Sequence, residues 1–164
     1  MDYGMISQIE KARLYAEEPE RVTFRSLDIH FDGDNDAYHV TLAEEGWRCS
    51  CQGFEAHRIC PHVMALERLL RPMLPLPPLP YAPGQNVVSD VEKASRYAQE
   101  SDRIHVRAFE ATLRGLNSDH EVGYGDGNWH CDSDSFRRRG VSSHTIAMER
   151  LLGGMFRVKD EPAA

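Results

Sequence analysis

The chain has 164 residues, of which 41% are hydrophobic, and its formal net charge is -7. This length suits one ordinary domain or two small ones, and no apolar run approaches the roughly 20 residues that a membrane-spanning helix needs. The acidic excess disfavours a protein that coats DNA non-specifically, because such binding depends on Lys and Arg neutralising phosphates. The first residues lack the basic start and apolar middle of a signal peptide, so we expect a cytoplasmic protein with no membrane partner.

The first predicted element is a helix near the N-terminus. A capping box, in which serine stands three residues before glutamate, predicts that the helix starts around Ser7–Glu10. Apolar residues then recur on one helical face, which we interpret as a core-facing surface. These residues are Ile6, Ile9, Ala12, Tyr15 and Ala16.

A strand and a hairpin follow this helix. Apolar residues alternate along residues 22–24 and again along 27–31, and the change of phase between the two runs predicts a bulge in one strand. Gly33 and Asn35 lie in the predicted turn, and alternation over residues 38–42 predicts the return strand. The aspartates of this turn lack the downstream glutamate of a calcium-binding loop, so calcium is the less favoured interpretation.

Residues 47–70 carry the strongest functional signal. Four candidate ligands stand in the order C-x-C, eight residues, C-P-H: Cys49, Cys51, Cys60 and His62. In an extended segment alternate side chains leave the same face, so the first two thiols can reach one ion. Proline after the third cysteine suits the first position of a helix, whose dipole favours a thiolate at its N-terminus. We predict one structural Zn²⁺ per chain and regard buried or disulfide-linked cysteines as the alternative.

This pattern resembles the SWIM zinc finger. The resemblance rests on the C-x-C and C-x-H pairs, on Phe54 between them and on the apolar helix that follows. It implies a β-hairpin before the first cysteine, which the residues upstream fit. It also implies binding to DNA or to proteins, alongside helicase-like, transposase or recombination machinery.

A proline-rich segment, residues 71–85, separates two similar halves. Its six prolines favour an extended, semi-rigid spacer. The alternative is that it serves as a ligand for a domain with an aromatic groove.

The chain repeats itself after half its length. Ile6–Leu70 aligns without a gap with Val88–Leu152, and about one third of the aligned positions are identical. A second capping box predicts that the second helix starts around Ser89–Glu92. We interpret the protein as a tandem duplication.

The predicted fold is α+β with two similar small domains. Each has a helix, a β-hairpin or three-stranded antiparallel sheet, a zinc-knuckle-like loop and a C-terminal helix. We assign residues 1–70 to the intact repeat and 71–85 to the linker. Residues 86–152 form the degenerate repeat, and residues 153–164 form a tail that we expect to fray after a helix-ending glycine.

The second half has lost part of the ligand set. Cys131 and His144 keep two of the ligand types, but Ser133 and Ser142 replace the other two cysteines. A serine hydroxyl is not a normal structural zinc ligand, so we predict a hydrogen-bonded cluster in place of an ion. The alternative is a rebuilt metal site, and its additional ligands would be drawn from His130, Asp132 and Asp134.

No nucleotide-binding loop, nuclease carboxylate cluster or catalytic triad is recognisable in the sequence. Because a four-ligand zinc site has no open position for a substrate, we expect no enzyme activity and no small-molecule substrate. Our first hypothesis is a zinc-binding adaptor or accessory in protein–protein interaction. A redox or nucleophilic role for the leftover cysteine beside its histidine is a further hypothesis.

The alternative function is direct DNA or RNA binding. Arginines flanking an aromatic ring could hold phosphates and stack a base. The candidate contacts lie at one edge of the finger and in the matching loop of the second half: Arg58, Phe136, Arg137, Arg138 and Arg139.

Overall fold

The computed structural model describes residues 3–156 of the chain. Each half runs through one helix, a 3-10 turn, three strands and two further helices. The first half contains α1 (Tyr3–Glu17), β1 (Val22–Asp32), β2 (Ala37–Ala43), β3 (Gly46–Cys49), α2 (Gln52–His57) and α3 (Pro61–Leu70). The second contains α4 (Val87–Gln99), β4 (Ile104–Arg114), β5 (Asp119–Gly125), β6 (Asn128–Cys131), α5 (Asp134–Arg139) and α6 (Ser143–Leu152). None of the described helices is both long and apolar enough to cross a membrane.

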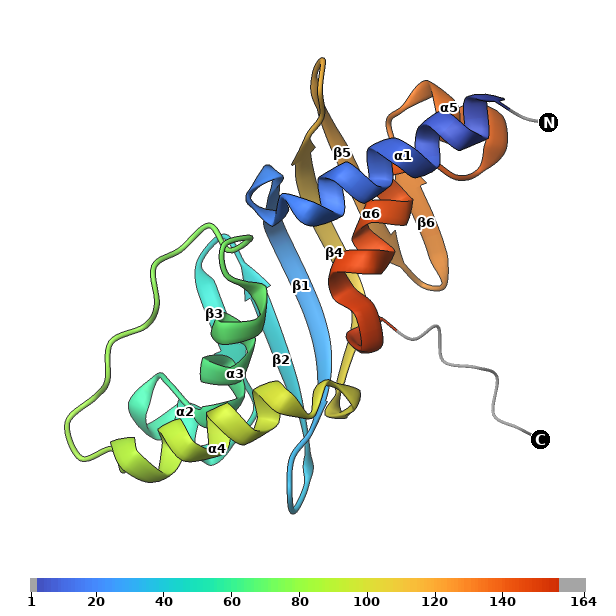
Figure 1. The fold of residues 1–164 in the computed structure, drawn as a ribbon. Helices are drawn as coiled ribbons and strands as arrows, with labels where there is room; N and C mark the ends of the chain where they lie inside the picture. Colours follow the sequence, from blue (N-terminus) through green and yellow to red (C-terminus); the bar gives the residue numbers. More distant parts are fainter. Residues whose placement is uncertain (1–2, 157–164) are drawn as a thin grey trace, which may run out of the picture.

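A single six-stranded antiparallel sheet joins the two halves, in the order β3-β2-β1-β4-β5-β6 (Figure 1). The central strands β1 and β4 pair with Leu27 opposite Phe109. These two residues are half a chain length apart (109 − 27 = 82, half of 164), so an approximate twofold axis passes between them. The predicted α+β class is confirmed, and the halves share one sheet.

The first helix of each half packs on the other half. Figure 1 shows α1 crossing over α6 and α4 crossing α3. Tyr15 of α1 stacks on His144 with ring centroids 5.7 Å apart, and Tyr97 of α4 stacks on His62 at 5.6 Å. We therefore define the first lobe as β1, β2, β3, α2 and α3 with α4. The second lobe is β4, β5, β6, α5 and α6 with α1.

The same tyrosines tie each crossing helix to a hairpin. The Tyr15 hydroxyl accepts a hydrogen bond from the Leu116 backbone N–H at 3.1 Å, and the Tyr97 hydroxyl accepts one from the Asp34 N–H at 3.2 Å. Buried hydroxyls need such partners, so the bonds fix where each helix lies across the sheet.

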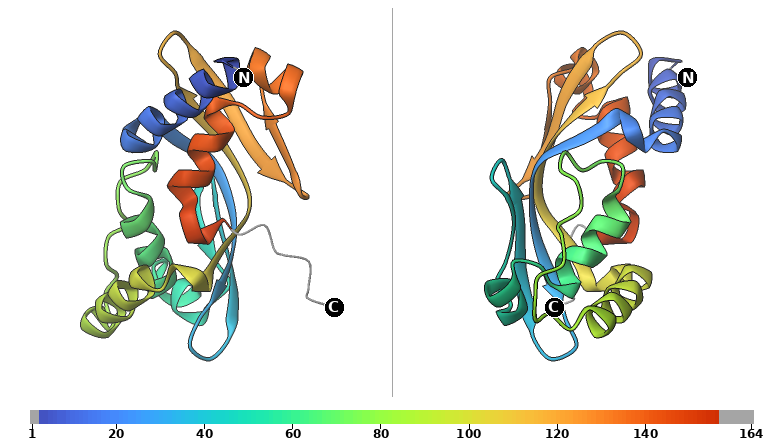
Figure 2. Two further views of the ribbon diagram at one scale, coloured as in Figure 1. Left: turned by 45° about the vertical axis from the view of Figure 1, so that its right-hand side comes forward. Right: turned by 90° about the vertical axis from the view of Figure 1, so that its left-hand side faces the viewer.

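The core lies between the sheet and four helices. Helices α1, α3, α4 and α6 all lie on one face of the sheet, and the opposite face has none of them (Figure 2). Buried and exposed residues alternate along β1, as the sequence pattern predicts. The alternation slips by one residue at Arg25, where the register with β4 shifts between Phe24 and Ser26. The predicted bulge is confirmed.

The predicted helix starts are wrong. Helix α1 begins at Tyr3, so Ser7 lies inside it, and Asn86 caps α4 by accepting a hydrogen bond from the Ser89 N–H at 3.3 Å. Asparagine is as good an N-cap as serine, so α4 starts directly after Asn86 and not at the predicted Ser89.

The first turns of α1 and α4 extend past the core. Ile6 and Ile9 are 39% and 44% exposed, and Val88 is 70% exposed. Further along α1, Ala12 and Tyr15 are buried. The apolar face predicted for these helices is therefore a core surface only in its second half.

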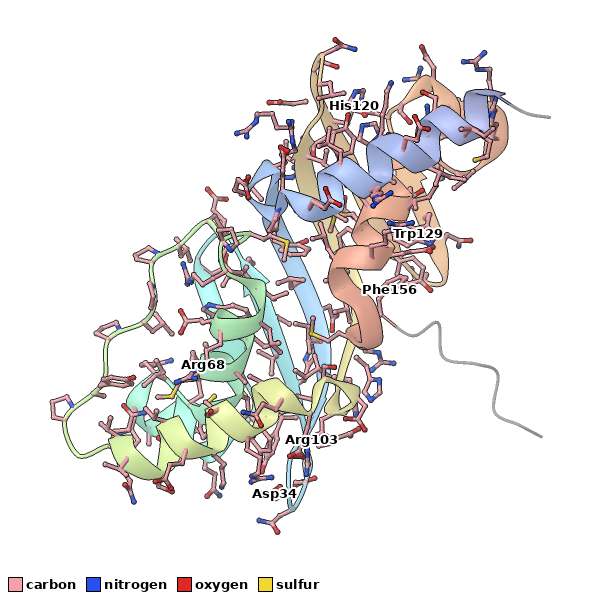
Figure 3. The ribbon with its side chains drawn as sticks, in the orientation of Figure 1. Asp34, Arg68, Arg103, His120, Trp129 and Phe156 are labelled. Carbon is pink, nitrogen blue, oxygen red and sulfur yellow. The ribbon has the colours of Figure 1, made fainter. Side chains whose placement is uncertain are left out.

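The chain after α6 begins with packed residues. The 3-10 turn Gly153–Met155 follows the helix, and Met155 is 5% exposed. Phe156 packs on Trp129, with ring centroids 5.1 Å apart, and on Tyr124 at 4.7 Å (Figure 3). The expectation of a frayed tail is wrong for residues 153–156, because these side chains complete the second lobe's core. Residues 157–164 lie outside the described residues.

The proline-rich spacer contains no helix or strand. It packs on the first lobe: the Met73 carbonyl accepts a hydrogen bond from the Phe24 N–H at 2.9 Å, and Glu67 Oε2 accepts one from the Leu79 N–H at 3.1 Å. Tyr81 remains 56% exposed. These bonds hold the spacer against the core as it crosses toward α4.

Candidate metal centre

The four predicted ligands converge where β3 meets α2 and α3. Cys49 ends β3, and Cys51 and Cys60 are the N-caps of α2 and α3. His62 lies in the first turn of α3. The four ligand atoms all lie within 4.8 Å of one another, and Cys49 Sγ is 3.8 Å from His62 Nδ1. Tetrahedral zinc holds such atoms about 3.6 to 3.8 Å apart, so the donor set and its spacing fit one Zn²⁺.

Two of the thiols cap helices. Cys51 Sγ accepts a hydrogen bond from the Phe54 N–H at 3.4 Å, and Cys60 Sγ accepts one from the Val63 N–H at 3.5 Å. Helix N-termini carry partial positive charge, which favours the thiolate that zinc requires. Helix α2 was not predicted, because its six residues are too few to show a helical period.

The three thiols compete for ionisation. Hydrogen bonds with Cys49 and Cys60 hold the pKa of Cys51 far below its ordinary value. Hydrogen bonds with Cys49 and Cys51, together with burial, hold the pKa of Cys60 far above it. The hydrogen bond with Cys51 raises the pKa of Cys49 to about 11. Zinc requires all three thiols as thiolates, and the charge of a bound ion would offset their mutual repulsion.

Aromatic rings enclose the histidine ligand. The His62 ring lies 4.4 Å from Tyr38, 5.0 Å from Phe31 and 5.6 Å from Tyr97, centroid to centroid. His62 is 6% exposed and Cys60 is fully buried. Because Tyr97 belongs to α4, the second half of the chain completes the wall of the site. The arrangement is that of a closed structural site.

The second lobe keeps this geometry with two donors exchanged. Cys131 Sγ lies 3.7 Å from His144 Nδ1, 3.4 Å from Ser133 Oγ and 3.5 Å from Ser142 Oγ. The serines take over the capping: Ser133 Oγ accepts from the Phe136 N–H at 3.3 Å, and Ser142 Oγ accepts from the N–H of residue 145 at 3.2 Å. Serine is a strong N-cap, so both helices keep their caps without a metal ligand.

The residues of the alternative, rebuilt metal site are engaged elsewhere. His130 Nε2 lies 2.7 Å from Glu110 Oε1, and Asp132 Oδ1 lies 2.9 Å from His120 Nδ1. Asp134 pairs with an arginine of its own helix. Within residues 3–156, the Cys49–His62 set is the one group of three or more such ligands that converges.

The predicted partner contacts occupy different environments. Arg58 is exposed at the C-cap of α2, with a left-handed φ of 63°. The matching segment of the second half is the short helix α5, where a loop was expected. Phe136 on α5 packs partly against the core, so its ring is only half accessible.

The three arginines of α5 diverge. Arg137 donates to Asp134 Oδ1 at 2.7 Å and to the Asp132 carbonyl at 2.9 Å. The Arg139 guanidinium lies against Gly4 of α1. Arg138 is exposed. The three arginines of the predicted contact therefore have different surroundings.

Restoring the two cysteines is expected to create a second zinc site. Ser133→Cys with Ser142→Cys gives the second lobe a Cys₃His set at positions that already converge, so zinc per chain should rise from one to two. Metal analysis of the purified protein measures this ratio. The control is Ser135→Cys with Ser143→Cys, which should bind one zinc. Two zinc ions in the unmodified chain would contradict the assignment of a single site.

Acid is expected to destabilise the second lobe through His144. Burial lowers the pKa of His144 to about 4, and the nearby His120 adds to the effect. The unfolded chain takes up this proton near pH 6.5, so unfolding becomes easier as pH falls from about 6.5 to 4, by up to about 3 kcal/mol. Urea unfolding of the chain and of His144→Gln across this range measures it. Equal pH slopes for the two proteins would contradict the prediction.

Comparison with known proteins agrees with the geometry. Residues 38–70 match the SWIM zinc finger family, over a segment that runs from β2 to the end of α3 and contains all four ligands. The resemblance noted in the sequence is confirmed, and the Cys₃His cluster is one Zn²⁺ site. No curated protein and no solved structure matches the chain.

Proposed function

We propose that the SWIM zinc finger formed by residues 38–70 makes this chain a non-enzymatic adaptor or accessory in protein–protein interaction with DNA-processing machinery. The observation that carries the proposal is the closed site: four protein ligands complete the coordination of zinc and leave no position for a substrate or an activated water. Zinc then sets the shape of a binding surface, and no small-molecule substrate is needed. The link to DNA-processing machinery rests on the family resemblance.

The face of the sheet opposite α1, α3, α4 and α6 supports a protein partner (Figure 2). Some of its charged and polar side chains are paired: Arg25 contacts Glu121 at 2.7 Å, and His39 contacts Asp28 at 2.8 Å. A nucleic acid would require unpaired cations, whereas a balanced polar surface is ordinary for transient protein contacts. The net charge of -7 points the same way.

Direct nucleic-acid binding is the second candidate function. Exposed Arg58 and Arg138 are the observations that favour it. Against it, the half-buried Phe136 offers little of its ring to a base, and Arg137 is already paired with Asp134. We therefore place the protein adaptor first.

DNA binding at two salt concentrations tests this order. We expect no affinity tighter than about 100 µM for single- or double-stranded DNA at low salt, measured by fluorescence anisotropy. Tight binding that weakens steeply with salt and disappears when Arg137, Arg138 and Arg139 become alanine would overturn the adaptor proposal. The control replaces three exposed arginines elsewhere: Arg13, Arg68 and Arg150.

We further infer that the two halves arose by tandem duplication. The sequence repeat and the recurrence of every helix and strand after half the chain length support this. A cytoplasmic location is part of the same proposal, because all four cysteines are unpaired, as reducing compartments require.

A further inference from the structure

A polar pocket opens beside the serine-containing cluster of the second lobe. Its volume is about 220 Å³. Helix α1 forms one wall, and the turn between β4 and β5 and the first residues of α5 and α6 form the others. The pocket is smaller than the several hundred Å³ typical of whole-ligand sites, so it suits one chemical group of a larger molecule.

A buried imidazole lines this pocket. His144 is 6% exposed, and its ring stacks on Tyr15 at 5.7 Å and lies tilted against His120 at 4.2 Å. Its Nδ1 faces Cys131 Sγ at 3.7 Å, which leaves Nε2 as the other ring nitrogen. Because His144 lines the pocket and Nδ1 is on the Cys131 side, Nε2 is the nitrogen left to bond a group that enters.

The neighbouring histidine is not available for a ligand. His120 Nδ1 bonds Asp132 Oδ1 at 2.9 Å, and its Nε2 bonds Ser118 Oγ at 3.1 Å. With both nitrogens engaged, the ring of His120 only holds His144 in place.

The unpaired charges at the pocket are positive. Lys11 of α1 and Arg138 of α5 both line it, and neither forms an ion pair or hydrogen bond within the described part of the chain. Asp134 also lines the pocket, but Arg137 neutralises it at 2.7 Å. Two free cations beside a polar imidazole favour a doubly charged oxyanion.

The first lobe differs at two of the matching positions. Tyr38 stands where the second lobe has His120, and its larger ring lies 4.4 Å from His62. Ala56 stands where the second lobe has Arg138. One lobe therefore holds the metal, and the other has the cavity and its cations.

We propose that this pocket binds a phosphate group, with Lys11 and Arg138 contacting its oxygens and His144 Nε2 hydrogen-bonded to it. The inference stands apart from the adaptor proposal, because it concerns α1, α5 and α6 and not the zinc finger.

The test is a titration of the full zinc-loaded chain with inorganic phosphate, followed through the imidazole ¹⁵N resonances at constant ionic strength. The His144 Nε2 resonance should shift and saturate. Lys11→Ala and Arg138→Ala should each weaken binding about tenfold, as expected for a charged hydrogen-bond donor. The controls are Arg137→Ala, the already paired neighbour, and Lys93→Ala, the matching lysine of α4, and each should change affinity less than about twofold.

Three further probes identify the source of the phosphate group: a phosphoserine peptide, an oligonucleotide with a 5′-phosphate, and acetate. The peptide or the oligonucleotide should bind in competition with inorganic phosphate, and acetate should bind at least about tenfold more weakly because it carries one charge. A His144 resonance that does not move, an equal loss in Arg137→Ala, or acetate binding as well as phosphate would overturn the proposal. Unchanged melting temperatures show that each variant is folded.

Discussion

Replacing Cys60 with alanine is expected to abolish zinc binding and unfold β3, α2 and α3. Zinc contributes about 10 kcal/mol or more to the folding of small zinc domains, and a whole domain has only about 5 to 15 kcal/mol of stability. Cys60 is fully buried and also caps α3, so alanine removes a ligand and a cap together. Far-UV circular dichroism, an amide NMR spectrum and metal analysis should show the loss.

The second lobe offers a matched control at the equivalent position. Ser142→Ala removes the cap of α6 but no metal ligand, so it should cost about 1 kcal/mol and leave zinc bound. A chelator should reproduce the effect of Cys60→Ala in the unmodified chain. A melting curve that neither the substitution nor the chelator changes would show that the ion is not structural.

Neither half of the chain is expected to fold alone. In residues 1–85, α1 lacks α6 and α3 lacks α4, and β1 loses its central partner β4. In residues 86–164, α6 lacks α1 and α4 lacks α3, and β4 loses its central partner β1. Each fragment should give the poorly dispersed amide NMR spectrum of an unfolded chain. Mixing the two fragments with zinc should restore the dispersed spectrum of the whole protein.

A substitution at the twofold axis tests the same interface within the intact chain. Phe109 is 1% exposed and packs edge-on against Phe24 of β1 at 5.8 Å. Phe109→Ala should therefore cost about 3 to 5 kcal/mol by urea unfolding. The control is Leu116→Ala, at a position that is 52% exposed, which should cost much less. A folded spectrum from residues 1–85 alone would contradict the interdependence of the halves.

Local patterns in the sequence predicted local structure well. The slipped alternation around Arg25 predicted the bulge, because side-chain direction along a strand depends only on neighbouring residues. The C-x-C pair and the proline after Cys60 predicted the ligand geometry for the same reason. The SWIM match over residues 38–70 agrees with this part of the interpretation.

The crossing of the helices could not be predicted in this way. An apolar face on α1 shows that the helix covers a core, but the two halves are similar, so the pattern does not say which core it covers. Tyr15 and Tyr97 have the same sequence context, and only the structure shows each stacked on the histidine of the opposite lobe. The pocket beside His144 was missed too, because its walls come from four separated segments.

The exchange of helices also constrains how the protein is made. During synthesis the metal-binding cysteines leave the ribosome well before Tyr97, the ring from α4 that closes their histidine off from water. Helix α1 lacks its partner for longer still, because that partner, α6, is the last α-helix of the described residues. Domains usually fold as units while translation proceeds, but here α1 acquires its final neighbour only after α6 has been translated.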